Sequence, residues 1–531
     1  MIRAYGAIIV DETIPTPPTP EPNPVVYFFS PRAIDADGNC IVAEIEVEKG
    51  GSVSSLQAQP DLTALGLTAD GWTHSLTDLS NITHDIYVGA MYKPTDGKTH
   101  VRVKFANASQ LTPSLYLTLN SGTLYIDYGD GSDPEVFTAT GNVTPSHKWP
   151  AVGEYDITVW AEGDGASYNL GRTSQYRFFG GTSANYYPLV TEVILSGQVK
   201  QTYYAFHGAN TCTKSPILPR GLDINVSSFS NWQAATTPLV IPPECIISGS
   251  SVFSYWSKCE YPPVYPKGQN LNSYVFQNWF QCKYPIIIYD RSIPNYVTQN
   301  WTSCRRPPIF AGDTTTIGNY AFSNWYACKE PPKLPDSCTN VGDNTFEHWH
   351  TCREYPDITK LTTVGSYAFG YWYNAGGTLS NMAPMPGSSA FAYNNNPLAR
   401  FENVSKHTTF NMSLFQNWTA LEAFPDIPAN KTTITGAATS MYRVSSPVII
   451  PENISNLSGA GGFQHLHNVP YFEFKRAAPP SIGASYFPPG ANNQYFIPIY
   501  VPNGSVEAYK TAINWVNYAD RIRPRSELDN N

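Results

Sequence analysis

Five stretches in the middle of the chain repeat one phrase: VFSYWSKCEYPP (252–263), VFQNWFQCKYP (275–285), VTQNWTSCRRPP (297–308), AFSNWYACKEPP (321–332) and TFEHWHTCREYP (345–356). In four of them a phenylalanine, a tryptophan and a cysteine follow one another at intervals of three positions, and in the third a threonine replaces the phenylalanine. A repeat of roughly 20–50 residues is typical of a solenoid, whose coils bury their apolar faces only against their neighbours.

The repeat extends well beyond these five copies. The tryptophans recur every 22 to 24 residues from Trp232 to Trp372, and Trp418 stands two periods later. The three-position spacing predicts a short helical or 3₁₀ turn with all three side chains on one side. The segments that follow, such as IIIY and PPKLP, predict short strands that stack as a parallel ladder about 4.8 Å apart. Weaker copies, which bring the total to about twelve coils, begin at Ala205, Ala390 and Phe463.

The cysteine slot predicts a buried, reduced column, with no disulfides, no metal and no cofactor. In other coils the slot holds Ala235, Ala375 or Leu421, so it accepts apolar side chains, and free cysteine behaves as a small hydrophobe. Zinc sites need paired short spacings, which the sequence lacks. The tryptophans could form an exposed belt of sugar-binding platforms, but their place beside phenylalanine and cysteine favours the core. The predicted core ladder consists of Trp256, Trp279, Trp301, Trp325, Trp349, Cys259, Cys282, Cys304, Cys328 and Cys352.

Asparagines precede many of the tryptophans. We expect them to form amide hydrogen bonds along the edge of the coils. They stand at Asn231, Asn278, Asn300, Asn324 and Asn417.

The residues directly after the cysteine slot form the candidate ligand-binding site. Stacked in register, they give a narrow, mainly basic stripe edged by tyrosine and glutamate. Like charges about 5 Å apart repel, so the stripe must be solvated or paired. Two interpretations remain: a solvated face neutralised by its own glutamates, or a shallow groove for an acidic or neutral polysaccharide. The candidate residues are Tyr261, Lys283, Tyr284, Arg305, Arg306, Lys329 and Arg353.

Composition excludes several classes of protein. Hydrophobic residues make up 42% of the 531 residues, too many for a wholly disordered chain. The net charge of −9 argues against a general nucleic-acid binder, which needs a basic surface. No apolar run approaches the roughly 18–20 residues that cross a bilayer. The N-terminal stretch MIRAYGAIIVDE lacks the features of a secretory signal, so we expect synthesis in a cytoplasm without export by that route or membrane insertion.

Two small β-rich domains are predicted before the solenoid. Residues 1–25 contain DETIPTPPTPEPNP, which favours extended polyproline II. This segment is either a tether of little sequence meaning or the spacer of an N-terminal docking peptide. Residues 26–94 predict a small mixed β domain. Residues 95–180, with the alternating pattern EYDITV, predict an antiparallel β-sandwich.

The C-terminal part is predicted to be a strand-plus-helix cap. The solenoid should occupy residues 181–475 and the cap residues 476–531, so the predicted fold class is mainly β and multidomain. Ser505 is a suitable N-cap for the helix. The apolar stripe expected to seal the last coil consists of Val506, Tyr509, Ile513 and Val516.

The phrase IGNYAFSNWYACKEPPKLP (317–335), followed by VGDNTFEHWHTC (341–352), resembles the BspA-like leucine-rich repeat family. Repeats of that family read roughly Ile-Gly-x-x-Ala-Phe-x-x-Cys-x-x-Leu. Here tryptophan stands in place of the family's cysteine, and cysteine or alanine in place of its leucine. The resemblance, which the C-terminal cap strengthens, implies the same fold with bulkier packing.

Weaker resemblances lie upstream. YIDYGDGSD (125–133) with HKWPAVGEYDITV (147–159) resembles a PKD-type immunoglobulin-like domain, and residues 44–92 are similar to β-grasp repeats of bacterial surface adhesins. The junction DGKTHVRVKF (96–105) is similar to phage and prophage proteins. These resemblances imply adhesion and display. A calcium site is conceivable in the PKD-like region, although a turn is favoured, at Asp127, Asp130 and Asp133.

Three functions are weighed on this basis. The favoured one is a bacteriophage virion protein (a tail fibre, tail-tip or head fibre) whose N-terminal peptide docks on other virion proteins. Its solenoid would attach to a host-surface glycan or protein, and a homo-oligomer is compatible with this role. The first alternative is a secreted or surface-anchored bacterial adhesin. The second is a depolymerase tailspike, which needs two carboxylates in one groove. No enzyme is expected because the acids of the coils stand singly, at Asp290, Asp313, Asp343 and Asp357.

Overall fold

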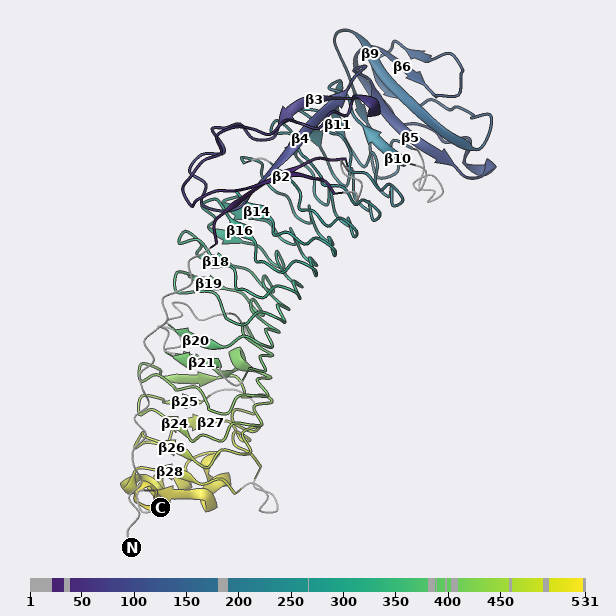
Figure 1. Ribbon diagram of the computed structural model, residues 1–531. Coiled ribbons are helices and arrows are strands. Elements are labelled where there is room, and N and C mark those ends of the chain that lie inside the picture. The colour runs from purple at the N-terminus through teal and green to yellow at the C-terminus, as the bar shows by residue number, and fades with distance from the viewer. Residues whose placement is uncertain are drawn as a thin grey trace.

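The computed structural model shows a curved solenoid of stacked coils, with strands β5, β6 and β9 at one end and a C-terminal cap at the other (Figure 1). The predicted class, a mainly β multidomain chain with a solenoid of about 12 coils, is confirmed. The predicted docking peptide and most of the proline-rich linker lie outside the described residues. The described residues are 22–32, 39–179, 190–265, 267–380, 387, 389–396, 399–402, 409–457, 461–489 and 496–528.

The N-terminal module contains a mixed sheet in the order β2-β1-β4-β3. Its central strands β1 and β4 are parallel, and both outer pairs are antiparallel. Because successive side chains of a strand point to opposite faces, Val26 and Phe28 enter the core of the module, whereas Tyr27 and Phe29 face the solenoid. The strands are β1 (Val25–Phe29), β2 (Ile41–Glu46), β3 (Leu67–Trp72) and β4 (Ile86–Pro94).

The sandwich region and the solenoid share one sheet. Strand β9 pairs antiparallel with β5 and β6 and parallel with β11, which starts the ladder of coils through β12 and β13. Strand β10 pairs with β5, so the predicted boundary between residues 180 and 181 falls within one hydrogen-bonded unit. The strands are β5 (Thr99–Phe105), β6 (Leu117–Asp127), β7 (Glu135–Phe137), β8 (Gly141–Val143), β9 (Gly153–Leu170), β10 (Val190–Ile194), β11 (Val199–Thr202), β12 (Asp223–Ile224) and β13 (Ile246–Ile247).

The strands of the later coils are short and pair in parallel with the equivalent strands of the next coil. They form separate ladders along the solenoid, such as β15-β17-β18-β19 and β24-β26-β28-β29. They are β14 (Ile287–Ile288), β15 (Ser292–Ile293), β16 (Ile309–Phe310), β17 (Thr316–Ile317), β18 (Asn340–Val341), β19 (Thr363–Val364), β20 (Gly377–Ser380), β21 (Ala399–Glu402), β22 (Thr409–Asn411), β23 (Thr433–Thr435), β24 (Val448–Ile450), β25 (Asn456–Leu457), β26 (Phe472–Phe474), β27 (Ser481–Ile482), β28 (Ile499–Val501) and β29 (Ile522–Pro524).

A column of indole rings runs through the solenoid core. From Trp232 to Trp372, rings of neighbouring coils stack with centroids 5.3 to 5.9 Å apart and planes within 17° of parallel. Each indole N–H donates to a backbone carbonyl of the preceding coil, as from Trp279 to Phe253 at 2.7 Å and from Trp325 to Thr298 at 2.9 Å. The rings are therefore both buried and hydrogen-bonded, which satisfies the one polar atom of each.

The aromatic turns of residues 253–352 are not helical, contrary to the expectation of a helical or 3₁₀ turn, whereas the coil of Trp418 does contain the 3₁₀ helix η4 (Met412–Phe415). Within residues 253–352, the described positions around the Phe, Trp and Cys slots form turns. The residue two before the Phe slot and the residue before the Trp slot have positive φ, as at Tyr274 (63°) and Asn278 (65°). A left-handed residue between two turns stops a helix from propagating. Asparagine suits such a position because it tolerates the left-handed region better than most residues.

All nine cysteines are free and buried. In the cysteine slot each thiol lies close to the carbonyl two residues later, 3.4 Å for Cys282 and 3.2 Å for Cys352. Burial raises the pKa of the Cys259, Cys304 and Cys352 thiols to about 12. The structure thus places the ten residues of the predicted core ladder inside the solenoid, each with no exposed surface.

The cap differs in detail from the prediction. Helix α1 (Val506–Thr511) ends before the predicted stripe is complete, and the Ser505 side chain makes no capping hydrogen bond. Tyr509 is buried, but Ile513 and Val516 are 86% and 58% exposed, because the chain after Thr511 no longer follows the helical period. The 3₁₀ helix η7 (Trp515–Arg521) seals the last coil instead, through buried Trp515 and Tyr518. No helix in the described parts of the chain is long and apolar enough to span a bilayer.

The indole column predicts a strong effect of Trp301→Ala. The change removes a fully buried ring that stacks on two neighbours and leaves the Phe276 carbonyl without its donor. We expect the free energy of unfolding in urea to fall by about 3–5 kcal/mol. The matched change Lys258→Ala, at an exposed position of the same solenoid, should alter it by less than about 0.5 kcal/mol. Equal effects of the two substitutions would contradict a stabilising column.

Candidate functional site

The predicted stripe divides into two columns with different surroundings. The first position after the cysteine slot is exposed on four successive coils, at Lys283, Arg305, Lys329 and Arg353. The second position carries Tyr261, Tyr284 and Arg306, where the chain turns into the strands that face the N-terminal module. The structure therefore does not present the seven candidate residues as one open surface.

Aromatic rings of the N-terminal module cover the two tyrosines of the second column. Phe29 packs edge-on against Tyr261 and Tyr284 at 5.7 and 6.0 Å, and Tyr27 packs against Tyr284 at 5.7 Å. The hydroxyl of Tyr261 accepts a hydrogen bond from the backbone N–H of Cys40 at 3.2 Å. These tyrosines belong to an interface within the chain.

Three ion pairs join the same module to the solenoid and the adjoining sheet. Arg306, the third residue of the second column, is not covered by the rings; its Nη1 lies 2.7 Å from Asp85 Oδ2 and its side chain is 44% exposed. Arg220 pairs with Asp70 at 2.9 Å. Arg32 pairs with Glu192 at 2.8 Å, with both side chains almost fully buried. Figure 1 shows β2 near the coil that carries β14, and β3 and β4 nearer to β11 at the start of the solenoid.

The first column remains open to solvent. Lys283 pairs with Glu260 at 2.6 Å. In the described part of the chain, Arg305, Lys329 and Arg353 form no ion pair. These three residues, here called the open cation column, are what remains of the predicted stripe as a candidate binding surface.

A second set of side chains, not predicted as a site, flanks the indole column; Tyr326 is exposed and the other five are half-buried. We call it the aromatic–histidine ladder. One of its columns occupies the slot before the tryptophan, and the other occupies the slot after it. The ladder consists of His348, Tyr371 and Tyr393 in the first column and Tyr326, His350 and Tyr373 in the second.

Rings within each column of the ladder stack across coils. His348 and Tyr371 have centroids 4.2 Å apart, as do Tyr371 and Tyr393. His350 lies 4.7 Å from Tyr326, on which it stacks, and 4.7 Å from Tyr373, to which its ring is tilted by 34°. His348 Nδ1 and His350 Nε2 are 3.1 Å apart and link the two columns. The result is one continuous surface across four Trp slots, from Tyr326 to Tyr393.

Burial shifts the pKa of three ladder side chains away from neutral pH. Burial, and then the neighbouring His350, lowers the pKa of His348 to about 4. Burial also lowers the pKa of His350 and raises that of Tyr371 to about 12. The carboxylate beside the ladder is Glu347, whose Oε1 lies 3.7 Å from His348 Nε2.

The sequence contained a signal for the ladder that the slot analysis passed over. In four of the five earlier coils the slot before tryptophan holds asparagine, the exception being Tyr255. The predicted amide ladder is present there: Asn300 donates to Asn278 at 2.5 Å and Asn324 donates to Asn300 at 2.6 Å. At His348, Tyr371 and Tyr393 the same slot holds histidine or tyrosine, before asparagine returns at Asn417. That change of residue type at a constant slot marks where the surface changes character.

Several of the acids considered for catalysis or calcium binding have structural roles. Asp290 accepts a hydrogen bond from the Leu271 N–H at 2.8 Å, and burial raises its pKa to about 6. Asp130 pairs with His147 at 2.7 Å and Asp127 accepts from the Gly129 N–H at 2.8 Å, as in a tight turn. Among the described residues, no three His, Cys, Asp or Glu side chains gather as a metal site would require.

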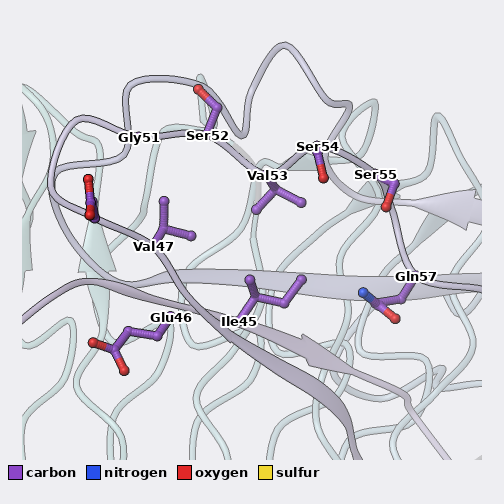
Figure 2. A pocket seen from close by; sticks show the side chains of 10 residues that line it. Ile45, Glu46, Val47, Gly51, Ser52, Val53, Ser54, Ser55 and Gln57 are labelled. Carbon is purple, nitrogen blue, oxygen red and sulfur yellow. The ribbon is translucent and has the colours of Figure 1, made fainter.

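A surface pocket lies on the N-terminal module, away from both columns. Its volume is about 440 Å³. Figure 2 shows Ile45, Glu46 and Val47 on one side and the segment from Ser52 to Gln57 on the other. Its lining contains hydroxyl, amide and carboxylate groups but no histidine, cysteine or cation.

Comparison with known proteins identifies the repeat. Residues 291–422 match the BspA type leucine rich repeat region in six copies. No curated protein matches the chain. A leucine-rich repeat protein from Bacteroides ovatus ATCC 8483 is 16% identical, with a TM-score of 0.39 over 52% of this chain and 77% of that one. A leucine rich cell surface protein from Faecalibacterium prausnitzii A2-165 is 13% identical, with a TM-score of 0.30 over 51% of this chain and 79% of that one.

The docked module predicts a local effect of the double change Tyr261→Ala and Tyr284→Ala. Loss of their packing against Phe29 and Tyr27, at about 0.5–1.5 kcal/mol per aromatic pair, should loosen the module. We expect faster hydrogen exchange in β1 and β4, measured by mass spectrometry, with an unchanged solenoid. Tyr442→Ala, at a 45% exposed tyrosine, is the control. Unchanged protection of β1 and β4 in the double variant would show that the tyrosines do not hold the module.

Proposed function

We propose that this protein is an attachment protein of a bacteriophage particle, a tail fibre, tail-tip or head fibre, whose solenoid binds a host-surface polysaccharide. The observation that carries the proposal is the open cation column. Arg305, Lys329 and Arg353 occupy one slot on three successive coils, are exposed, and form no ion pair among the described residues. A repeating surface of this kind suits a repeating polymer, because each coil can make the same contact with the next unit.

Electrostatics favours an acidic polymer at this column. Like charges on coils about 4.8 Å apart repel one another in the free protein. A ligand with regularly spaced carboxylate or phosphate groups removes that repulsion as it binds. Contacts that repeat along one ligand also act together, so weak single contacts add up to useful avidity.

The proposed attachment to a particle rests on the N-terminal sequence. Residues 11–24 contain six prolines, which suits a semi-rigid spacer between residues 1–10 and the body of the protein. In this proposal residues 1–10 dock on other virion proteins. The N-terminal module and the sandwich region then hold the solenoid outward.

We propose binding without catalysis. A glycosidase needs two carboxyl groups at a fixed separation across a groove. Among the acids considered, Asp290 is buried, and its oxygens are engaged by Leu271 and Tyr265. The open cation column supplies charge recognition but no acid–base pair.

Binding to host cells tests the attachment function. The purified full chain is titrated onto cells before and after removal of their surface polysaccharide, alongside the triple change Arg305→Ala, Lys329→Ala and Arg353→Ala. We expect stripped cells to lose binding, and the triple variant to bind about tenfold more weakly with less dependence on salt. A control triple variant, Lys200→Ala, Lys258→Ala and Lys360→Ala, removes the same charge from other exposed positions. Full binding to stripped cells would overturn the attachment proposal.

Immunogold labelling of intact particles tests the location. We expect label on the head or the tail of the particle, and its loss when residues 1–10 are deleted. Label confined to a bacterial cell wall would contradict the particle assignment and identify the protein as an adhesin.

A further inference from the structure

We propose that the aromatic–histidine ladder is a second binding site, and that its ligand is a linear, uncharged polysaccharide lying along the solenoid axis. The inference rests on the proposed function in one respect, since it assigns the ligand to the same class of polymer. It concerns different residues on a different segment of each coil.

The first support is that the backbone conformation sets the direction of the side chains in the column before the tryptophan. His348, Tyr371 and Tyr393 all have positive φ, at 63°, 60° and 66°. The same backbone conformation in the same slot directs the three side chains alike. The indole column beneath them, with Trp349 and Trp372 stacked at 5.4 Å, fixes the spacing of the coils. The ladder is thus a rigid surface before any ligand arrives.

The second support is the way in which the rings stack. Neighbouring rings cover one another's faces. The ladder therefore presents mainly ring edges, tyrosine hydroxyls and imidazole groups to the solvent. Tyr326 is the most open member, with 38% of its surface exposed. Tyrosine offers an apolar body and a polar tip at a low cost in conformational entropy, which suits recognition of ligands with many hydroxyls. Stacking reduces that cost further because the rotamers are already fixed.

Charge narrows the class of ligand. In the described residues, no ladder side chain forms an ion pair with a lysine or arginine, and the carboxylate next to it is Glu347. Single-stranded nucleic acids also stack on aromatic residues, but their sites add cations that follow the phosphates. An acidic polysaccharide would likewise find no partner here. A neutral glycan matches a surface rich in hydrogen-bonding groups.

The direction of the columns sets the direction of the ligand. Both columns cross successive coils, so a chain that runs along the solenoid axis meets a new ring on each coil, about 4.8 Å further on. A chain that runs across the coils would meet one coil only. Affinity should therefore increase with ligand length until the ligand spans the ladder.

The experiment measures binding of the full chain to linear neutral glucans, mannans and galactans of graded length, and to sulfated and uronic-acid glycans. We expect at least one neutral glycan to bind, more tightly as its length increases. The double change Tyr371→Ala and Tyr373→Ala should weaken that binding about tenfold or more. Tyr371→Phe with Tyr373→Phe keeps the stacked rings and removes the hydroxyls, so a loss there assigns recognition to the ring rims. Thermal unfolding of each variant checks that the solenoid is intact.

The chain offers a matched control. Tyr255 occupies the same slot before Trp256 and is 42% exposed, but its slot neighbours are Asn231 and Asn278. Tyr255→Ala should leave glycan binding unchanged. Binding of no neutral glycan, binding that the ladder variants leave intact, or binding that ignores length would each overturn the inference.

The outcomes also separate the two proposals. Binding of acidic glycans alone, abolished by the open cation column variant, would overturn the ladder site and support the proposed attachment function. A different result would be that neutral glycans bind through the ladder while the protein binds host cells equally well after their polysaccharide is removed. That result would support the ladder site and overturn attachment through surface polysaccharide. Capture of a protein in place of any glycan would overturn the ladder inference.

Discussion

Each tryptophan from Trp232 to Trp372 donates its indole N–H to a carbonyl of the preceding coil, and its ring stacks on the next indole. The remaining features of the solenoid depend on this contact, because it fixes both the spacing and the register of the coils. Where Asn394 replaces tryptophan, Tyr355 fills the vacant place: it stacks on Trp372 at 5.3 Å and accepts a hydrogen bond from Asn394 at 2.7 Å. The column continues through a substitute ring, which indicates how strongly the packing requires an aromatic side chain there.

The same coil geometry that builds the core also builds the outer surface. A left-handed residue must precede each tryptophan for the chain to turn from the Phe slot to the Trp slot. Except at the buried Asn278, its side chain is half-buried or exposed, so this slot becomes a column of amides in one part of the solenoid and a column of rings in another. The backbone conformation is constant, and the side chain placed on it decides the chemistry of the surface. Such a surface can change its ligand without any change in the fold.

The N-terminal module changes what the solenoid can offer to a partner. By covering Tyr261 and Tyr284 and pairing with Arg306, it engages three of the seven residues of the predicted stripe in contacts within the chain. The buried pair of Arg32 and Glu192 adds a contact that would be costly to break, since either charge left alone would be buried without a partner. The module is therefore held against the first coils and is not a free spacer.

The sequence by itself determined the solenoid, its period and the identity of its core, because a buried slot must be filled in every coil and so repeats visibly. Trp325 and Cys328 could be assigned to the interior from the residues that replace them elsewhere. The same repetition predicted the amide hydrogen bonds of Asn300 and Asn324. Only the tertiary structure decided which residues outside the solenoid core are open to solvent. Tyr284 and Lys283 are neighbours in sequence, yet one lies under Phe29 and the other in solvent, and the covering residues are more than 200 positions away. The end of helix α1 before Ile513 was also a tertiary outcome, because Trp515 and Tyr518 fill the last coil in a way that no helical period shows.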